Sequence, residues 1–185
     1  MRIKLCNKNS MIDLGGIAKG YIADKVIELY KENNVESGII NLGGNIKVIG
    51  KKEDDKLWEI GIYEPEKHSN NIVCTIKAEN KSIVTSGAYE RGFICGDKYY
   101  HHIINPMTGY PAKSDLKSIT IVSDASIDGD GLSTPLFIMG KYKAYEFMKK
   151  NNISGIMITN DDEIIITKDL LEDFTLIQEY NVMCF

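Results

Sequence analysis

The sequence has few of the residues, and none of the long apolar runs, that mark several common protein classes. Its 185 residues include only 4 prolines, 1 tryptophan and 4 cysteines. The cysteines form no Cys-x-x-Cys pair, which argues against a zinc site or a redox motif and favours free thiols in a reducing compartment. No apolar run approaches the roughly 20 residues of a membrane span, and no apolar signal-peptide core precedes Asp13. We therefore expect a cytoplasmic protein.

Basic residues are also in the minority. Lysine and arginine number 22 against 26 aspartates and glutamates, a net charge of −4, and the two signs are mixed along the chain. Nucleic-acid binding needs a basic face, so we expect no nucleic-acid partner, although a metal ion and a few backbone amides can still bind a small anion. With 43% hydrophobic and 26% charged residues, residues 1–185 are expected to fold as one domain.

Helical and strand periodicities predict an α+β fold. Apolar residues at helical spacing predict helices over residues 17–33 and 132–149, with Gly140 as a point where the second could break. The tail, residues 170–185, is compatible with a short helix or a final strand. Because the strands follow one another in hairpin-like runs, we expect largely antiparallel sheets with two main helices. Apolar and alternating patterns predict about eight or nine strands, at residues 38–42, 46–49, 58–63, 72–77, 82–85, 99–104, 118–122, 155–159 and 163–167.

A glycine-rich turn at residues 13–20, Asp-Leu-Gly-Gly-Ile-Ala-Lys-Gly, leads into the first predicted helix. Gly15 and Gly16 let the backbone approach a ligand, the helix N-terminus favours an anion, and Lys19 adds a charge suited to phosphate. A tight strand-to-helix turn with a solvated lysine explains the same residues. The spacing matches neither the dinucleotide-binding Gly-x-Gly-x-x-Gly motif nor a Walker A loop.

Two further segments combine glycines with polar side chains. Residues 41–45, Asn-Leu-Gly-Gly-Asn, permit close approach to a ring edge or a phosphate, and a strand bulge or hairpin turn is the alternative. Residues 85–91, Thr-Ser-Gly-Ala-Tyr-Glu-Arg, offer two hydroxyls that suit a diphosphate and a tyrosine ring that could stack on a planar ligand. An ordinary strand end is the alternative for this second segment.

Residues 101–109, His-His-Ile-Ile-Asn-Pro-Met-Thr-Gly, join a predicted strand to a turn. Neighbouring strand residues point to opposite faces, so His101 and His102 are poor joint ligands for one metal. One histidine could face a cleft as a general acid or base, and we assign His101 to the structural alternative.

Residues 128–134, Asp-Gly-Asp-Gly-Leu-Ser-Thr, place oxygen ligands at helical spacing. Asp130 and Thr134 share one face of a helical turn. Two such ligands, with the other positions left to water and substrate phosphates, are what Mg²⁺ prefers. Capping of a helix N-terminus by Asp or Ser is the alternative for any one of these residues, and the ligand spacing of an EF-hand is absent.

In this order, the five motifs closely resemble the ApbE-like family of flavin transferases, over about residues 12–140. The resemblance implies an ApbE-like, T-fold-related α+β architecture, with this chain corresponding to the carboxy-terminal two-thirds of such an enzyme. It implies a Mg²⁺-dependent FAD:protein FMN transferase, which moves FMN from FAD to a threonine hydroxyl of an acceptor flavoprotein and releases AMP. An FAD pyrophosphatase, and a catalytically impaired flavin-binding remnant or subunit, are the alternatives.

The resemblance also implies roles for particular residues, with FAD as substrate and Mg²⁺ as cofactor. His102 matches the histidine associated with catalysis. The side chains of Asp130 and Thr134, and the carbonyl of Ala18, match the ligands of Mg²⁺. The residues expected to bind FAD are Asp13, Gly15, Gly16, Lys19, Asn41, Gly43, Gly44, Thr85, Ser86, Gly87, Tyr89 and Thr108.

The sequence departs from the family pattern in places. Asn105 replaces a usual aspartate, Ala88 a usual acidic residue, and Gly129 and Pro135 usual alanines. Because proline is tolerated only in the first turn of a helix, we expect Pro135 to shift the start of its helix. The short stretch before the first motif predicts a missing amino-terminal segment, so that exposed sheet edges would invite a homodimer or a partner segment. Family members are often exported and membrane-anchored.

Overall fold

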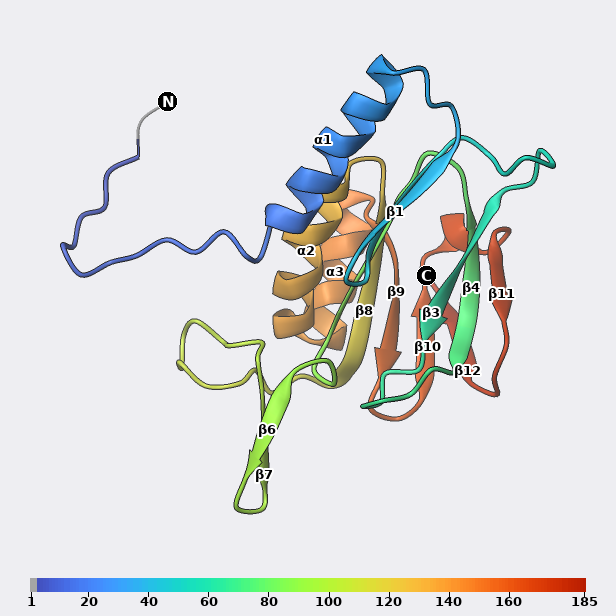
Figure 1. Ribbon diagram of the computed structural model, residues 1–185. Coiled ribbons are helices and arrows are strands. Elements are labelled where there is room, and N and C mark those ends of the chain that lie inside the picture. The colour runs from blue at the N-terminus through green and yellow to red at the C-terminus, as the bar shows by residue number, and fades with distance from the viewer. Residues whose placement is uncertain (1–2) are drawn as a thin grey trace.

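The computed structural model describes residues 3–185, which form three α-helices, one 3₁₀ helix and twelve strands (Figure 1). The helices are α1 (Ala18–Glu32), α2 (Ser126–Met139), α3 (Lys141–Asn151) and the 3₁₀ helix η1 (Lys168–Leu170). The strands are β1 (Gly38–Leu42), β2 (Asn45–Ile49), β3 (Trp58–Tyr63), β4 (Ile72–Ala78), β5 (Ser82–Gly87), β6 (Gly92–Cys95), β7 (Lys98–His101), β8 (Leu116–Ser123), β9 (Ser154–Thr159), β10 (Glu163–Ile166), β11 (Phe174–Leu176) and β12 (Asn181–Cys184). Within residues 3–185, no helix has both the length and the apolar character that crossing a membrane requires.

A seven-stranded sheet forms the centre of the fold, in the order β1-β2-β5-β8-β9-β10-β12. Its neighbouring pairs are antiparallel except β10 and β12, which run parallel. A three-stranded sheet, β11-β4-β3, and the two-stranded hairpin β6–β7 complete the strands of the described residues. The predicted α+β class with largely antiparallel sheets is confirmed.

Hydrophobic side chains pack on both faces of the seven-stranded sheet. The helices lie over one face and the three-stranded sheet over the other (Figure 1). In β9, Ile156 and Ile158 pack in the cluster shared with β3 and β4, whereas Met157 between them packs in the cluster under α2 and α3. Successive strand residues point to opposite faces, so a strand buried on both faces has a continuously apolar sequence. The core therefore lies in two layers, one on each side of the sheet.

The helical stretch predicted for residues 132–149 is two helices. Gly140 separates them, with a φ of 76° that ends α2, and the carboxylate of Asp115 accepts a hydrogen bond from the N–H of Lys141 (2.6 Å) at the start of α3. The described residues therefore form three α-helices where two main ones were expected. The break falls at the glycine that the sequence singled out.

The start of α2 lies earlier than predicted, and Pro135 lies inside the helix, not in its first turn. The expectation for Pro135 is therefore wrong. A proline at this position leaves one backbone carbonyl without its helical partner, on a side of α2 where Pro135 itself is exposed. The early start has a tertiary cause, since the carboxylate of Asp24 in α1 accepts hydrogen bonds from the N–H groups of Ser126 and Ile127.

Strand β6 was not predicted, and β7 ends at His101, whereas the expected strand ran to residue 104. The hairpin β6–β7 projects from the body of the molecule (Figure 1), and all four residues of β6 are exposed. A strand that is exposed on both faces leaves no alternation of apolar and polar residues to recognise. The tail forms η1, β11 and β12, so both a short helix and strands occur there.

The four cysteines differ in burial, which allows a direct chemical test of the fold. Cys74 in β4 is fully buried, and burial raises the pKa of its thiol to about 12, whereas the other three thiols are exposed. Since the thiolate is the reactive species, we expect Ellman's reagent to titrate three thiols in the native protein and the fourth only after unfolding in guanidinium. Rapid reaction of all four native thiols would contradict the packing of β3, β4 and β11 described here.

Candidate functional site

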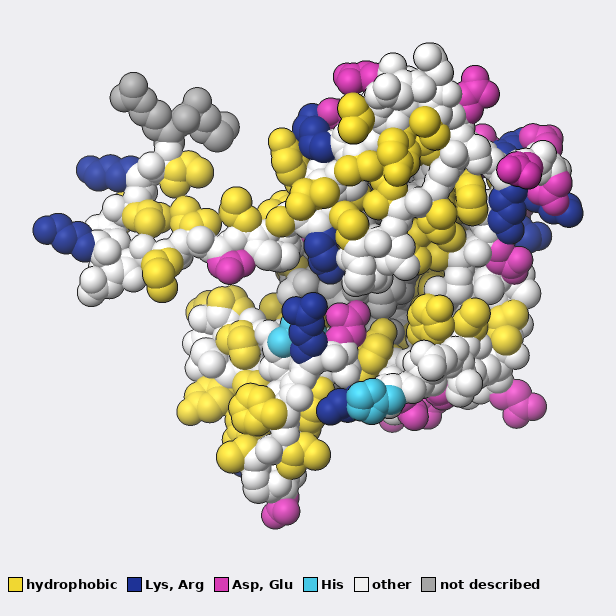
Figure 2. Space-filling view, in the orientation of Figure 1, with side chains coloured by type: hydrophobic (Ala, Val, Ile, Leu, Met, Phe, Trp, Pro, Cys, Tyr) yellow, Lys and Arg dark blue, Asp and Glu magenta, His cyan; other side chains and the backbone are white. Residues whose placement is uncertain are grey.

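A cavity of about 600 Å³ lies where α1 begins, between the β1–β2 turn, the end of β5, the segment after β7 and one side of α2. We call it the main cavity. Figure 2 shows basic, acidic and histidine side chains gathered around a hollow between α1 and the β6–β7 hairpin. Its lining residues are Asp13, Gly15, Gly16, Lys19, Leu42, Gly43, Thr85, Ser86, Glu90, Arg91, His102, Ile103, Ile104, Asp130 and Thr134. Most of the residues predicted from the five motifs are therefore brought together in one place.

The remaining predicted residues lie around or away from this cavity. Asn41, Gly44 and Tyr89 line an adjoining cavity of about 280 Å³, which shares Gly43, Thr85 and Glu90 with the main cavity and which we call the side cavity. Gly87 ends β5 beside the Tyr89 ring, and Ala18, the first residue of α1, is outside the lining of the main cavity. Thr108 lines a separate cavity of about 710 Å³ beside the β6–β7 hairpin.

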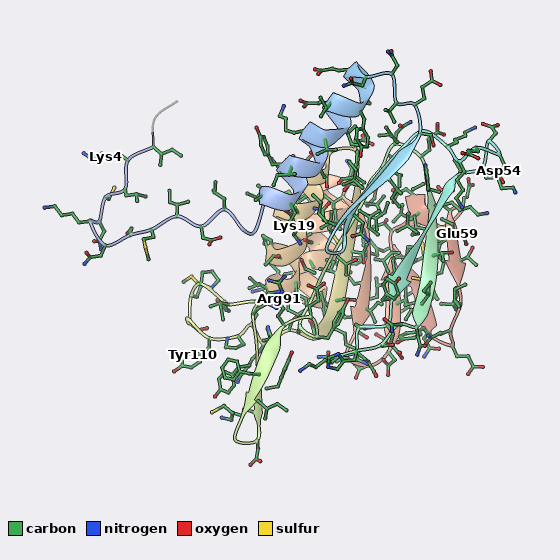
Figure 3. All side chains as sticks on the ribbon, viewed as in Figure 1. Lys4, Lys19, Asp54, Glu59, Arg91 and Tyr110 are labelled. Atoms are coloured by element: carbon green, nitrogen blue, oxygen red, sulfur yellow. The ribbon has the colours of Figure 1, made fainter. Side chains whose placement is uncertain are left out.

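Two charged residues in the lining were given no role from the sequence. Glu90 and Arg91 follow Tyr89 directly and were noted only as part of the motif at residues 85–91. Figure 3 shows Arg91 on the same side of the molecule as Lys19, below the start of α1. A lone arginine after a strand end has many explanations in a sequence. Only the fold shows that Arg91 and Lys19 line the same cavity.

The glycines of the two loops serve the local backbone. Gly43 and Gly44 have φ values of 61° and 87° in the two-residue turn between β1 and β2, a conformation that other residues rarely adopt. The side chain of Asn41 accepts a hydrogen bond from the N–H of Gly44 (3.0 Å) and closes this turn. The hairpin alternative therefore accounts for this motif locally, while the same turn also forms a wall between the two cavities.

The glycine-rich turn leads into α1 at the main cavity, which Asp13, Gly15, Gly16 and Lys19 line. The carboxylate of Asp13 accepts a hydrogen bond from the N–H of Gly15 (2.6 Å), and the carbonyl of Leu14 accepts from the first residues of the helix. Neither a capping side chain nor an acidic residue occupies the first turn of α1 itself. Of the first four N–H groups of α1, only that of Lys19 has no acceptor among residues 3–185, so the positive end of the helix dipole is the main feature here that favours an anion.

Asp130 is almost fully buried, with 5% of its surface exposed, and its two carboxylate oxygens differ. Oδ2 accepts a hydrogen bond from the N–H of Gly20 in α1 (2.9 Å). For Oδ1, no hydrogen bond is found among residues 3–185. One oxygen is thus held by the neighbouring helix, and the other is available to a ligand in the main cavity.

Thr134, one helical turn after Asp130, ends a chain of hydroxyl groups. Ser133 donates to the carbonyl of Asp130 (3.4 Å), Ser86 donates to Ser133 (2.9 Å), and Thr134 Oγ1 lies 3.1 Å from Ser86 Oγ. A hydroxyl has one proton to donate, so the proton between Thr134 and Ser86 comes from Thr134. The Thr134 proton therefore points toward Ser86, and the lone pairs of Thr134 Oγ1 are free to bind a cation.

These donors fit a hard divalent cation. A free carboxylate oxygen of Asp130 and the Thr134 hydroxyl are oxygen ligands of the kind that Mg²⁺ takes, with water and phosphate completing the shell. Within residues 3–185, no group of three His, Cys, Asp or Glu side chains converges on one point, as a closed protein cage for a metal would need. The donor set therefore suits a metal that is shared with a phosphate ligand.

The two adjacent histidines have different surroundings. Nε2 of His101 lies 3.0 Å from the carbonyl of Ala112, its Nδ1 accepts from the N–H of Ile103 (3.3 Å), and its ring packs edge-on against Phe137. His102 is exposed, and its Nδ1 lies 3.2 Å from the carbonyl of Arg91. A carbonyl only accepts hydrogen bonds, so Nδ1 of His102 carries a proton. Its Nε2 is then the basic nitrogen, with no partner among residues 3–185.

Tyr89 gives the side cavity a neutral aromatic wall. Burial, with a smaller contribution from the charge of Glu90, raises the pKa of its phenol to about 12. The phenol therefore stays protonated at neutral pH and can donate a hydrogen bond. Its ring can also stack on a planar ligand.

We expect the two histidines to respond differently to the same substitution. His101→Gln should lower the free energy of unfolding by about 1–3 kcal/mol, because it disturbs two hydrogen bonds of a part-buried ring. His102→Gln should change it by less than about 0.5 kcal/mol, since this side chain is exposed. Urea denaturation followed by circular dichroism measures both. Equal losses for the two variants would contradict the separate roles described above.

The fold and the cavity define an α+β protein in which basic side chains, hydroxyl groups and a buried carboxylate lie together at the start of one helix. The chain belongs to the ApbE family, whose model matches residues 2–157. The resemblance noted in the sequence is therefore confirmed.

Individual relatives and solved structures agree with this assignment. An FAD:protein FMN transferase of Klebsiella pneumoniae is 38% identical over 157 residues, which cover 84% of this chain and 48% of the relative. One of Treponema pallidum is 36% identical, with 80% of this chain and 43% of the relative covered. The ApbE protein of Thermotoga maritima superposes with a TM-score of 0.80 at 31% identity, over 88% of this chain and 53% of that structure. The flavin transferase ApbE of Vibrio cholerae gives 0.70 at 30% identity, over 80% of this chain and 47% of that structure.

The chain spans about half the length of the curated relatives that it matches. The family and the fold are shared over that length.

Proposed function

We propose that this chain carries the FAD-binding and catalytic residues of a Mg²⁺-dependent FAD:protein FMN transferase, which moves FMN from FAD to a threonine hydroxyl of an acceptor flavoprotein and releases AMP. The observation that carries the proposal is the main cavity itself. Lys19, His102 and Asp130 come from three separate segments of the chain and line this one cavity. Its relatives over the same residues are named FAD:protein FMN transferases.

The diphosphate of FAD belongs in the main cavity on electrostatic grounds. Lys19 and Arg91 supply positive charge, and the start of α1 adds the positive end of its helix dipole. The side cavity, which shares a wall with the main one and carries the Tyr89 ring, suits one of the two planar ring systems of FAD. A dinucleotide is long enough to need both cavities, and their shared wall is where its diphosphate would turn.

The main cavity also contains the carboxylates of Asp13, Glu90 and Asp130. These would repel a diphosphate unless a cation lay between them. Asp130 Oδ1 and Thr134 Oγ1 would hold Mg²⁺, with the Ala18 carbonyl as a predicted third ligand. When bound, Mg²⁺ supplies electrostatic stabilisation of the negative charge that develops on the diphosphate during the reaction.

His102 is placed to move the proton of the attacking hydroxyl. With its Nδ1 proton directed at the Arg91 carbonyl, Nε2 accepts the proton of the acceptor threonine. The threonine oxygen forms a bond to the FMN phosphorus, the phosphoanhydride bond breaks, and AMP leaves with the bonding electrons. Lys19 and Arg91 orient the diphosphate and neutralise part of the charge on the leaving group.

Hydrolysis is the second reaction that the site supports. The specific observation in its favour is the exposure of His102, which lets water reach the position of the threonine hydroxyl. Water activated by the same nitrogen would convert FAD to FMN and AMP. The chain would then act as an FAD pyrophosphatase.

The acceptor protein must approach from the exposed side of His102. A separate place where another polypeptide can pair with this chain is the free edge of β1. Among residues 3–185, β2 is the only strand that pairs with β1, and Ile39 on β1 is 45% exposed. An uncovered edge strand is a template for pairing with another chain. This supports the predicted association with a second copy or with a partner segment.

The metal and diphosphate part of the proposal is tested by calorimetric titration of FAD into the purified chain, with and without Mg²⁺. We expect Mg²⁺ to strengthen FAD binding. Asp130→Ala should remove that Mg²⁺ dependence, because it removes the buried carboxylate ligand. The matched control is Asp128→Ala, which removes an exposed carboxylate two residues earlier on the same helix. Absence of FAD binding under all conditions, or equal effects of the two substitutions, would refute the assignment.

Turnover is tested separately with His102→Gln. We expect the release of AMP from FAD, followed by chromatography, to fall by about 10²–10⁴-fold, the range typical for loss of a general base. FAD affinity should stay within a factor of about two, since the histidine acts on the attacking hydroxyl. Transfer to a threonine-containing flavoprotein is detected as an added FMN mass. Unchanged turnover in this variant would rule out the role of His102.

A further inference from the structure

Helices α1 and α2 each lack a capping side chain of their own. The residue before α1 is Ile17 and the residue before α2 is Ala125, and neither makes a side-chain hydrogen bond to its helix. The first N–H groups of a helix have no partner within that helix. In both helices the missing acceptor comes from the other helix.

Each of the two helices has a carboxylate that accepts hydrogen bonds from the start of the other. Asp24 of α1 accepts hydrogen bonds from the N–H groups of Ser126 (2.8 Å) and Ile127 (2.9 Å), one to each of its oxygens. In return, Asp130 of α2 accepts from the N–H of Gly20 (2.9 Å) in the first turn of α1. The pairings run in opposite directions along the two sequences, so the helices lie antiparallel with each carboxylate near the start of the other helix.

Gly20 sets how closely the helices approach. A Cβ atom on this residue would lie 2.4 Å from the carbonyl oxygen of Ser126 and 2.8 Å from Cβ of Asp130. Only a residue without a side chain fits this contact. The N–H of Gly20 can therefore reach the Asp130 carboxylate directly.

The first turn of α2 is also held from the sheet below. Ser126 Oγ donates to Asn45 Oδ1 (2.6 Å) and accepts from Ser82 Oγ (2.9 Å). Lys47, part of the same buried region, donates to the carbonyl of Asp124. Burial lowers the pKa of the Lys47 ammonium, and the carboxylates of Asp24 and Asp124 partly offset this effect. The Asp24 carboxylate thus accepts hydrogen bonds from a helix start, and its charge also acts on the buried Lys47 ammonium.

We propose that Asp24 is a positioning residue for Asp130. It holds the first turn of α2 against α1, so that Asp130, one turn further along, keeps one oxygen on the Gly20 N–H and directs the other into the main cavity. Through this contact Asp24 sets the affinity of the site for a divalent cation without touching the cation itself. The cation part of the inference rests on the proposed function, whereas the positioning of Asp130 does not.

The physical reason lies in the helix start. Without Asp24, the N–H groups of Ser126 and Ile127 would lose their acceptor in a part-buried place, where an unpaired donor is costly. The first turn would then fray, and Asp130 lies only four residues from Ser126. A carboxylate whose orientation is no longer fixed must be ordered again on metal binding, which weakens that binding.

The first test uses the protein without metal. Asp24→Asn keeps the size of the side chain but presents an amide nitrogen to one of the two N–H donors. We expect the Gly20 amide, one turn before Asp24 on α1, to exchange with solvent at least about tenfold faster by NMR, because its bond to Asp130 loosens. Unchanged exchange at Gly20 would overturn the proposal.

Asp115→Asn is the matched control. The Asp115 carboxylate accepts a hydrogen bond from the N–H of Lys141 at the start of α3, a bond of the same type. Neither Asp115 nor Lys141 lines the main cavity. This substitution also removes an acceptor from a helix start, at an exposed place away from α1, and should leave the Gly20 amide unchanged. Equal acceleration at Gly20 in both variants would mean general destabilisation and would overturn the proposal.

The second test measures Mn²⁺ binding by electron paramagnetic resonance, with Mn²⁺ as the probe for the cation. Asp24→Asn should weaken Mn²⁺ binding by about tenfold, the lower end of what partners behind a metal ligand contribute, and Asp115→Asn should leave it unchanged. Faster Gly20 exchange with unchanged Mn²⁺ affinity would show that Asp24 acts on the fold alone and would overturn the positioning role. Absence of Mn²⁺ binding by the unsubstituted chain would refute the metal part of the proposed function, and the Gly20 exchange would still decide whether Asp24 orients Asp130.

Discussion

Backbone N–H groups at the start of α1 and at the start of α2 have no partner within their own helices. In each case a carboxylate of the other helix accepts hydrogen bonds from that helix start. Asp24 accepts from Ser126 and Ile127, and Asp130 accepts from Gly20. Each helix therefore supplies an acceptor for the start of the other. These hydrogen bonds hold the glycine-rich turn, which precedes α1, next to the face of α2 that carries the candidate metal ligands.

The central sheet supplies the platform for the helix pair. Strands β5 and β8 lie in its middle and bury apolar residues on both faces, so the sheet positions the helices on one side rigidly. The end of β5 places Ser86 beside Thr134, where a chain of hydroxyl groups orients the Thr134 proton. The β6–β7 hairpin, in contrast, projects from the body and leads into His102, the exposed part of the candidate site. Candidate metal ligands on a packed helix, together with an exposed His102, suit the proposed reaction, in which a second protein must reach the bound substrate.

Periodicity predicted most of the regular structure because burial imposes it. Strands β8, β9 and β10 are buried on both faces and read as short apolar runs, whereas α1 is buried on one side and its apolar residues recur at helical spacing. Strand β6 was missed because it is exposed on both faces. The start of α2 and the place of Pro135 were missed because the cap of α2 comes from Asp24, 102 residues earlier in the sequence. The residues close to α2 in the sequence do not indicate a partner so far away in the chain.

By itself, the sequence determined the α+β class, the family and the residue types of the candidate site, because glycine turns, hydroxyls and a helical Asp-x-x-x-Thr spacing are local features. Only the tertiary structure decided which of these residues meet. It placed Thr108 in a separate cavity, added Arg91 and Glu90 to the lining of the main cavity, and gave the adjacent His101 and His102 different surroundings. The physical reason is that a site of this kind is made by contacts between segments far apart in the chain, whose distances and hydrogen bonds are set by packing and not by spacing in the sequence.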